Sequence, residues 1–401
     1  MISRYRWVIL SLAFLAFATT YMARMAYPPL IPEMSIELNL THAEAGMLMS
    51  GFFIGYLAMQ LPIGFVSDKI GVKRIFTISL VLTGILCILT GFAESFSECL
   101  TYRFTNGLAA GCIFAPGSAL VLRWFPPKDR AISISFFQIS VSVGTFIALS
   151  SSAAISSLFG RWSWSFWILG IPSLIIAIPS LFLLREKPEE IFEGDLADAG
   201  SGIGSYYGVV LRDLRMWLVC IATVGGGAAF IGSLTWIPTY FVRIVNLSEV
   251  YAGSISSLLA LAGIFGTPIG GFIADRILHK RSPIVFIGIL GSGLACIFFS
   301  IVVPSDLYSA IALFIPIPFF SAVWWIGPSL LSEWFPLKVL GTATGILNFM
   351  TISGCVLGPF IFGLILDLTN SFSHGWFALG AIASLSALLM IPIMLQDSKN
   401  V

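Results

Sequence analysis

A single basic residue stands inside the first long apolar run of the chain. The run extends from about Trp7 to Pro28, and Arg24 lies near its end with no acidic residue beside it. An ionisable side chain inside a membrane is costly and usually functional. An unpaired guanidinium in a cavity attracts an anion such as a carboxylate. We therefore interpret Arg24 as an anion ligand; the alternative is a side chain that extends to the membrane surface.

A second arginine, Arg103, opens the apolar stretch 100–124 and is followed four residues later by Gly107. It can act as a second anion ligand or as a structural anchor, and the residues alone leave both readings open. Arg243 follows an aromatic and proline-rich segment at the end of another apolar run. For Arg243 we favour a role at the membrane interface.

We expect the elements that hold these residues to be membrane helices. Hydrophobic residues make up 57% of the 401 and charged residues 10%, and the mean hydropathy is +0.96. Soluble domains have about 25% charged residues. We expect an all-α membrane protein with twelve transmembrane helices of about 20 residues each. The expected spans are 7–29, 43–65, 75–94, 100–124, 132–157, 163–184, 214–241, 250–275, 283–303, 306–332, 341–366 and 374–396.

The basic residues are distributed unevenly about these spans. With the N-terminus inside, 17 of the 21 Lys and Arg residues fall on the cytoplasmic side. Short cytoplasmic loops carry an excess of such residues. We therefore expect both termini in the cytoplasm, with the chain in the cell (inner or plasma) membrane.

The chain divides into two similar halves around one polar stretch. We expect residues 185–213 to form a cytoplasmic linker between six-helix bundles 1–184 and 214–401. The segment Pro62-Ile63-Gly64 recurs as Pro268-Ile269-Gly270, and Trp124-Phe125-Pro126 recurs as Trp334-Phe335-Pro336. Repeated halves of this kind are typical of secondary transporters.

The loop after the second expected span resembles the cytoplasmic loop signature of the major facilitator superfamily. It reads Gly64-Phe65-Val66-Ser67-Asp68-Lys69-Ile70-Gly71-Val72-Lys73-Arg74. Gly64 permits close helix approach and Gly71 a tight turn, while Asp68 can accept from a helix N-terminus and from basic groups. We expect a latch that holds the halves together; the alternative is a plain basic loop. The expected latch residues are Gly64, Asp68, Gly71, Arg74, Arg130, Asp275 and Arg276.

Several segments together resemble the anion:cation symporter branch of that superfamily, which includes sialic acid, vesicular glutamate and bacterial sugar-acid transporters. Tyr21-Met22-Ala23-Arg24 is similar to the branch's Y-x-D-R pattern in span one. Further similar segments are Gln60–Gly64, Arg103 to Gly107, Thr235–Tyr240 and Leu347–Phe349.

This resemblance implies a substrate site. Arg24 would bind the substrate carboxylate with help from Arg103, and Tyr56 and Asn348 would donate hydrogen bonds to the rest of the substrate. Trp236 and Trp325 would form walls of the cavity. For the two tryptophans and Tyr56 the alternative is ordinary packing, and for Asn348 it is a hydrogen bond between helices.

The chain also departs from the branch's pattern. Ala23 stands where span one of the branch has Asp, and Ala109 and Ala110 occupy the region where an acidic residue follows Arg103. Those carboxylates carry protons in the proton-coupled members. A coupling proton, a counter-anion and movement driven by the membrane potential all remain open.

We therefore predict a secondary active or facilitative transporter of a small organic anion, a carboxylate or sugar acid, that works by alternating access. The alternative is an exporter of hydrophobic compounds or drugs with the same fold.

Neither a phosphate loop nor a nucleophile–base spacing indicates an enzyme, and the six cysteines and three histidines have no metal-site spacing. We expect no cofactor, no metal and no nucleic-acid partner, since the net charge is +1. Each twelve-span chain is expected to function as a monomer in the lipid bilayer.

Overall fold

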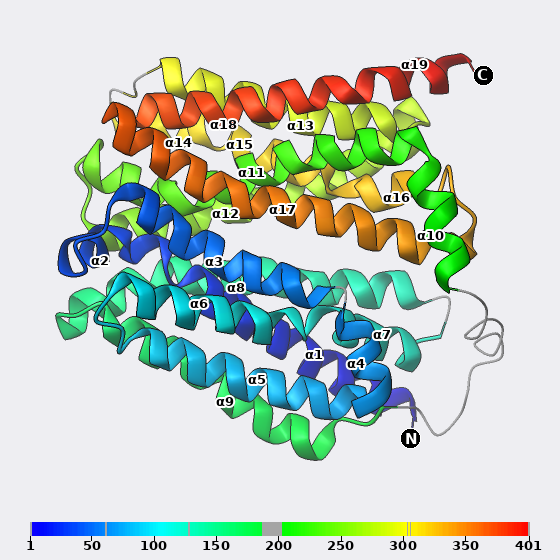
Figure 1. The fold of residues 1–401 in the computed structure, drawn as a ribbon, viewed down its shortest axis with the longest axis horizontal. Coiled ribbons are helices and arrows are strands. Elements are labelled where there is room, and N and C mark those ends of the chain that lie inside the picture. The colour runs from blue at the N-terminus through cyan, green and yellow to red at the C-terminus, as the bar shows by residue number, and fades with distance from the viewer. Residues whose placement is uncertain are drawn as a thin grey trace. The chain divides into compact units, whose positions relative to one another are not determined.

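The regular structure of the chain is helical throughout its described part. The computed structural model describes residues 2–60, 62–126, 129–186, 203–302, 304 and 306–399. Eleven helical segments in that part are long and apolar enough to cross a membrane. The second expected span, 43–65, coincides with α3 (His42–Gln60) and α4 (Pro62–Ile70). The prediction of an all-α membrane protein is confirmed (Figure 1).

Most of the other helices follow the expected spans to within a few residues, but α2 (Ile31–Glu37) lies after the first expected span and α10 (Ile203–Arg212) lies within the expected linker 185–213. The other helices are α1 (Ile2–Met25), η1 (Pro28–Leu30), α2 (Ile31–Glu37), α5 (Val72–Thr90), α6 (Phe96–Gly111), α7 (Phe114–Trp124), α8 (Arg130–Phe159), α9 (Ser163–Leu183), α10 (Ile203–Arg212), α11 (Leu214–Arg243), α12 (Glu249–Ile273), η3 (Ala274–Leu278), α13 (Ser282–Ile301), α14 (Leu307–Phe314), α15 (Pro316–Val323), η4 (Trp324–Ile326), α16 (Gly327–Leu331), α17 (Leu337–Thr369), α18 (Phe372–Ala387), η5 (Leu388–Met390) and α19 (Ile391–Lys399).

Some expected spans consist of consecutive shorter helices. The fourth is divided between α6 and α7, and the tenth breaks at Ile315 and again at η4. Pro316 and Pro328 lie at these two breaks in the tenth. Proline has no backbone N–H and its ring collides with the preceding turn, so it interrupts the hydrogen-bond pattern of a long helix. The polypeptide still continues in the same apolar segment, Leu307–Leu331.

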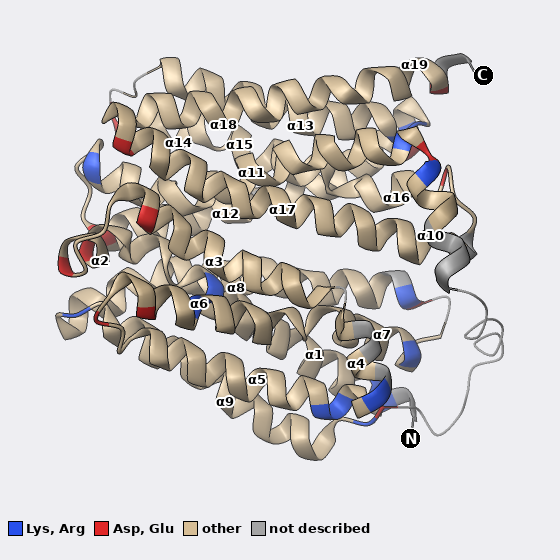
Figure 2. Ribbon diagram, in the orientation of Figure 1, with Lys and Arg blue, Asp and Glu red and all other residues tan. Residues whose placement is uncertain are grey.

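Charged residues gather near the helix ends, and long central stretches of the helices carry none (Figure 2). This distribution is expected because water is absent from the bilayer core. Arg24, in the last turn of α1, and Arg103, inside α6, differ from the other described charged residues because both are buried.

The described residues form two compact units. Unit 1 lies within residues 1–40, 51–199 and 248–257, and unit 2 within 41–50, 200–247 and 258–401. In unit 1, α1 packs on α8 and α9, and α5 packs on α6 and α9. In unit 2, α11 packs on α17 and α18, and α13 packs on α15 and α18. The domain boundaries expected from the sequence stay a prediction, and most of the expected linker 185–213 lies outside the described residues.

Glycine allows the closest helix contacts in each unit. In unit 1, a Cβ added at Gly55 of α3 would overlap the carbonyl oxygen of Phe104 in α6, and one at Gly107 would overlap that of Phe52. In unit 2, a Cβ at Gly354 of α17 would overlap the carbonyl oxygen of Val224 in α11. Membrane helices associate through such small-residue contacts because lipid supplies little hydrophobic driving force between them.

Candidate functional site

Arg24 lies inside a set of four aromatic rings in unit 1. Its side chain is 1% exposed. The guanidinium carbon is 4.2 Å from the ring centroid of Tyr21, 4.5 Å from Tyr56, 4.9 Å from Phe53 and 5.0 Å from Phe52. We call these four rings the aromatic box. Each cation–π contact is worth roughly 2 kcal/mol when desolvated, so the box offsets part of the several kcal/mol that burying a charge costs.

One edge of the Arg24 guanidinium has no hydrogen-bond partner. Its Nε and Nη2 atoms are buried and make no hydrogen bond in the described structure. No ion pair among the described residues includes Arg24. In arginine, the N–H groups of these two nitrogens point in the same direction and can donate side by side to a carboxylate. Arg24 therefore presents an unused two-donor edge of the kind that carboxylates bind.

Arg103 lies close to the same site but makes different contacts. It is 2% exposed, and its Nη2 donates to the backbone carbonyl oxygen of Arg24 at 3.4 Å. Its guanidinium carbon is 4.6 Å from the ring centroid of Tyr27 and 5.5 Å from that of Phe52. The Phe52 ring thus contacts both guanidiniums. The structure brings the two sequence-predicted arginines together and gives Arg103 a contact that fixes the backbone at Arg24.

The helix geometry explains how these side chains meet. Tyr21 and Arg24 are three residues apart in α1, a spacing that puts side chains on one face of a helix. Phe52 and Tyr56 share a face of α3 for the same reason. Close contact between α3 and α6 at Gly107 brings Phe52 next to Arg103. On the other side, Gly144 of α8 lies against Ala18 and Tyr21 of α1, where any larger side chain would collide.

Of the other predicted substrate residues, Tyr56 belongs to the aromatic box in unit 1. The remaining three lie in unit 2 and are Trp236, Trp325 and Asn348. Trp236 is fully buried in α11. Its Nε1 donates to the carbonyl oxygen of Pro359 at 3.0 Å, and its ring stacks on Phe362 with centroids 5.3 Å apart. These contacts favour a packing role, and a role of Trp236 in substrate binding stays a prediction.

Trp325 and Asn348 are more accessible than Trp236. Trp325 is 40% exposed, stacks on Trp324 with centroids 5.5 Å apart and meets the edge of Phe230 at 6.1 Å. Asn348 is half-buried in α17. An exposed indole supported by a second ring provides a flat apolar surface, so Trp325 remains a candidate substrate contact.

Comparison with protein families decides the class of the molecule. The model of the major facilitator superfamily matches residues 13–326. The chain belongs to the major facilitator superfamily. It is therefore a multi-pass membrane transporter and not an enzyme, and the family expected from the loop signature is confirmed.

Similar proteins match this chain over nearly its whole length. A probable sulfoacetate transporter of Cupriavidus necator is 26% identical over 98% of this chain and 96% of its own. The hexuronate transporter of Bacillus subtilis is 24% identical, covering 98% and 95%. A probable galactarate/D-glucarate transporter of Escherichia coli is 26% identical, covering 98% and 96%. A solved bacterial homologue of the human lysosomal transporter Spinster shares the fold, with a TM-score of 0.84 at 17% identity and 96% coverage of both chains.

The structure describes only part of the predicted latch. The surroundings of Gly64 and the side chain of Asp68 lie outside the described part of the structure. Gly71 adopts a φ of +94° directly before α5, a conformation that favours glycine. The backbone N–H of Lys73 donates to a carboxylate oxygen of Glu186 at 3.2 Å. Glu186, which the sequence did not indicate, thus caps the start of α5.

Other members of the predicted latch make contacts within their own units. The Nε of Arg130 donates to the carbonyl oxygens of Leu122 and Phe125 at 3.0 and 3.2 Å. Arg74 and Arg276 are exposed. A latch function for any of these residues stays a prediction.

In unit 2, Asp275 pairs with Arg281 at 3.3 Å. Arg281 also contacts Glu333 at 3.4 Å. Burial raises the pKa of Glu333, while the guanidinium of Arg281 opposes that shift. Arg281 thus joins Asp275 to the Glu333 carboxylate, a partner that the loop signature alone did not reveal.

Three members of the aromatic box, Tyr21, Phe52 and Phe53, were not identified as site residues from the sequence. The spacing of Tyr21 and Arg24 was a usable signal, since helical neighbours three residues apart touch. The contacts of Phe52 and Phe53 with Arg24 depend on how α3 packs on α1, which local spacing does not determine.

Proposed function

We propose that this facilitator transports a small organic anion whose carboxylate binds the free edge of Arg24. The observation that carries the proposal is the buried guanidinium with no carboxylate partner and two unused donors. A buried charge left unpaired is strongly unfavourable. A ligand carboxylate would supply both the missing charge and the missing acceptors.

The names of the similar proteins support this substrate class. Sulfoacetate, hexuronate, galactarate and glucarate are all small organic anions, and each of these names belongs to a relative with near full-length coverage. An exporter of cationic compounds would need a buried acid to bind its cargo, and the spans supply a buried arginine instead. We therefore favour the anion transporter over the drug exporter.

Transport would proceed by alternating access, with both termini in the cytoplasm and the chain active as a monomer in the cell membrane. Ala23, Ala109 and Ala110 offer no titratable group, so a coupling proton would have to travel on the substrate or on a group elsewhere. A counter-anion in exchange is the other candidate for coupling.

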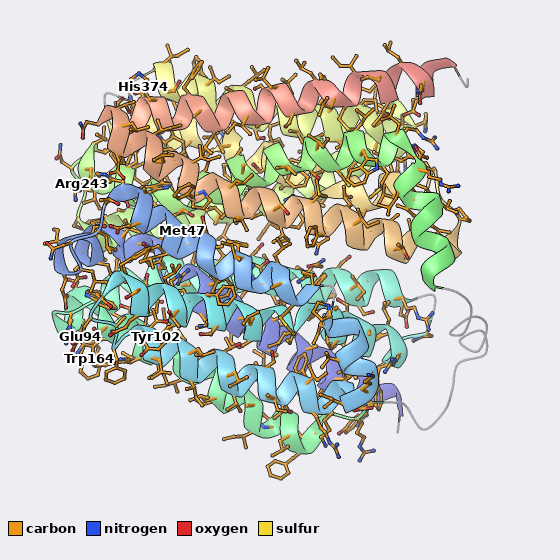
Figure 3. The ribbon with its side chains drawn as sticks, viewed as in Figure 1. Met47, Glu94, Tyr102, Trp164, Arg243 and His374 are labelled. Atoms are coloured by element: carbon orange, nitrogen blue, oxygen red, sulfur yellow. The ribbon has the colours of Figure 1, made fainter. Side chains whose placement is uncertain are left out.

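The proposal is tested with purified protein reconstituted in liposomes. Uptake of radiolabelled glucarate, glucuronate and sulfoacetate is measured for the wild type, Arg24→Ala, Arg24→Lys and a matched control, Arg243→Ala. Arg243 is an exposed arginine at the end of α11 (Figure 3). We expect Arg24→Ala to lower uptake at least about 100-fold, because a charge-assisted bidentate pair is lost. Arg243→Ala should transport like the wild type.

Thermal unfolding in detergent separates binding from folding in the same variants. A panel of carboxylates should raise the melting temperature of the wild type and leave that of Arg24→Ala unchanged. If Arg24→Ala still takes up the same anions at the wild-type rate, the proposed role of Arg24 is wrong.

A further inference from the structure

We propose that the aromatic box acts as a substitute counter-charge that lets the transporter reorient with no substrate bound. This inference rests on the proposed function and adds the role of Tyr21, Phe52, Phe53 and Tyr56 as positioning residues that act through Arg24. It addresses the part of the cycle in which the anion is absent.

The geometry supports a charge-balancing role for the four rings. All four ring centroids lie between 4.2 and 5.0 Å from one guanidinium carbon. The two phenylalanines, at 0% and 1% exposure, have no polar atoms, so they offer Arg24 only their ring faces. Aromatic faces carry partial negative charge, and their attraction for a cation is strongest where water is excluded.

The empty transporter faces a problem that the loaded one does not. During reorientation Arg24 must pass through a water-excluded state, where an uncompensated charge is strongly unfavourable. When the substrate is bound, its carboxylate neutralises Arg24. When the site is empty, no acidic residue of α1 can take over, since Ala23 stands beside Arg24. The rings are the groups that surround the cation in their place.

If the four ring faces attract the Arg24 guanidinium less strongly, net uptake and exchange should respond differently. Net uptake requires the empty transporter to return, whereas exchange of external for internal substrate uses only loaded states. Weakening the ring faces should therefore slow net uptake and leave exchange intact. A purely structural role for the rings would lower both rates together.

Phe53 is the ring best suited to the test. The Phe52 ring contacts both Arg24 and Arg103, and the hydroxyl groups of Tyr21 and Tyr56 can also bond to substrate. The Phe53 ring lies over Arg24 and carries no hydroxyl. Phe137 provides a matched control, because it is fully buried in unit 1 and stacks on Phe17 with centroids 5.0 Å apart.

The experiment introduces mono-, di- and trifluorophenylalanine at position 53, and separately at 137, by nonsense suppression. Fluorine withdraws charge from the ring face while changing its size little. Net uptake into empty liposomes and exchange into substrate-loaded liposomes are measured at zero membrane potential with glucarate. We expect net uptake to fall stepwise, by about tenfold with trifluorophenylalanine at 53, while exchange stays within twofold. The series at 137 should leave both rates unchanged.

The outcomes distinguish this inference from the proposed function. If the wild type exchanges glucarate but shows no net uptake, or if fluorination at 53 lowers both rates equally, the counter-charge role of the box is wrong and the anion function stands. If the wild type exchanges none of the three anions (glucarate, glucuronate and sulfoacetate), the proposed function is wrong and this inference is wrong with it.

Discussion

Arg24 of unit 1 and Trp236 of unit 2 are both large, buried side chains on long helices, but they differ in whether their polar atoms have hydrogen-bond partners. The Nε1 of Trp236 donates to the Pro359 carbonyl oxygen, and its ring stacks on Phe362. The Nε and Nη2 of Arg24 have no acceptor. Buried polar groups are normally hydrogen-bonded. The polar atom of Trp236 is thus used inside unit 2, whereas two donors of Arg24 in unit 1 have no acceptor within the described structure.

The comparison indicates where substitutions should affect stability and where they should affect transport. Groups whose hydrogen bonds are complete should change the free energy of unfolding when altered. Groups left without a partner, and the residues that hold those groups in position, should change substrate affinity. Four experiments test this distinction, in order of decreasing effect.

The largest effect is expected at the glycine contacts, which should matter equally in both units. Gly107→Ala and Gly354→Ala each place a methyl group onto a backbone oxygen of the facing helix. We expect each to lower the free energy of unfolding by about 3 kcal/mol through overpacking, measured by thermal unfolding in detergent. Gly345→Ala is the control, because a Cβ there meets no atom within 4 Å. Equal melting temperatures for all three variants would contradict the close helix contacts.

Trp236→Phe should lower stability and leave substrate affinity unchanged. The phenyl ring can keep the stack on Phe362, but the Pro359 carbonyl loses its donor, at a cost of about 2 kcal/mol. We expect a lower melting temperature and a KM for glucarate within threefold of the wild type. A KM raised more than tenfold with normal stability would instead assign Trp236 to the substrate site and remove the contrast with Arg24.

Arg103→Lys should alter affinity through the position of Arg24. Lysine keeps the charge but cannot reproduce the planar guanidinium that bonds the Arg24 carbonyl and lies over Tyr27. We expect KM to rise about tenfold, equivalent to about 1.4 kcal/mol, with little change in the maximal rate. An unchanged KM would make Arg103 a structural anchor only.

The smallest effect is expected for Asp213, whose side chain caps the N-terminus of α11 in unit 2. Its carboxylate accepts from the guanidinium and the backbone N–H of Arg215, and the guanidinium bond is the main reason that the pKa of Asp213 is lowered. A carboxyl group with a lowered pKa stabilises the fold above its ordinary pKa, near 4, and loses that contribution as pH falls through the lowered value. Asp213→Asn should therefore cost less than about 1 kcal/mol at pH 7. The difference in melting temperature should shrink as the pH is lowered below 4.

Much of the fold could be predicted because the bilayer restricts the alternatives. Apolar length alone placed the spans, and the expected helix 163–184 differs from α9 by one residue at its end. The interruptions within the tenth span were not predicted, although Pro316 and Pro328 mark them. A proline in an apolar run signals a distortion without showing whether the helix kinks or ends.

The site was predictable in part. A lone arginine in an apolar run pointed to Arg24 because burying a charge is expensive wherever it occurs. The ring contacts of Phe52 and Phe53 could not be read from the sequence, because they arise from the packing of α3 against α1. The sequence does not show whether Trp236 binds substrate or packs, because an aromatic residue in a helix has the same local pattern in either role. Its contacts with Pro359 and Phe362 favour packing, and its place in the substrate site stays a prediction.

The glycine contacts between α3 and α6 also bear on how such a transporter diverges. At Gly55 and Gly107 the touching atoms are backbone carbonyls and glycine Cα carbons, so the contact makes no demand on the identity of the facing side chain. Side chains elsewhere on both helices can then change while Phe52 keeps its distance from Arg103. A binding site whose framework is built from main-chain atoms can retain its shape across relatives that share only about a quarter of their residues.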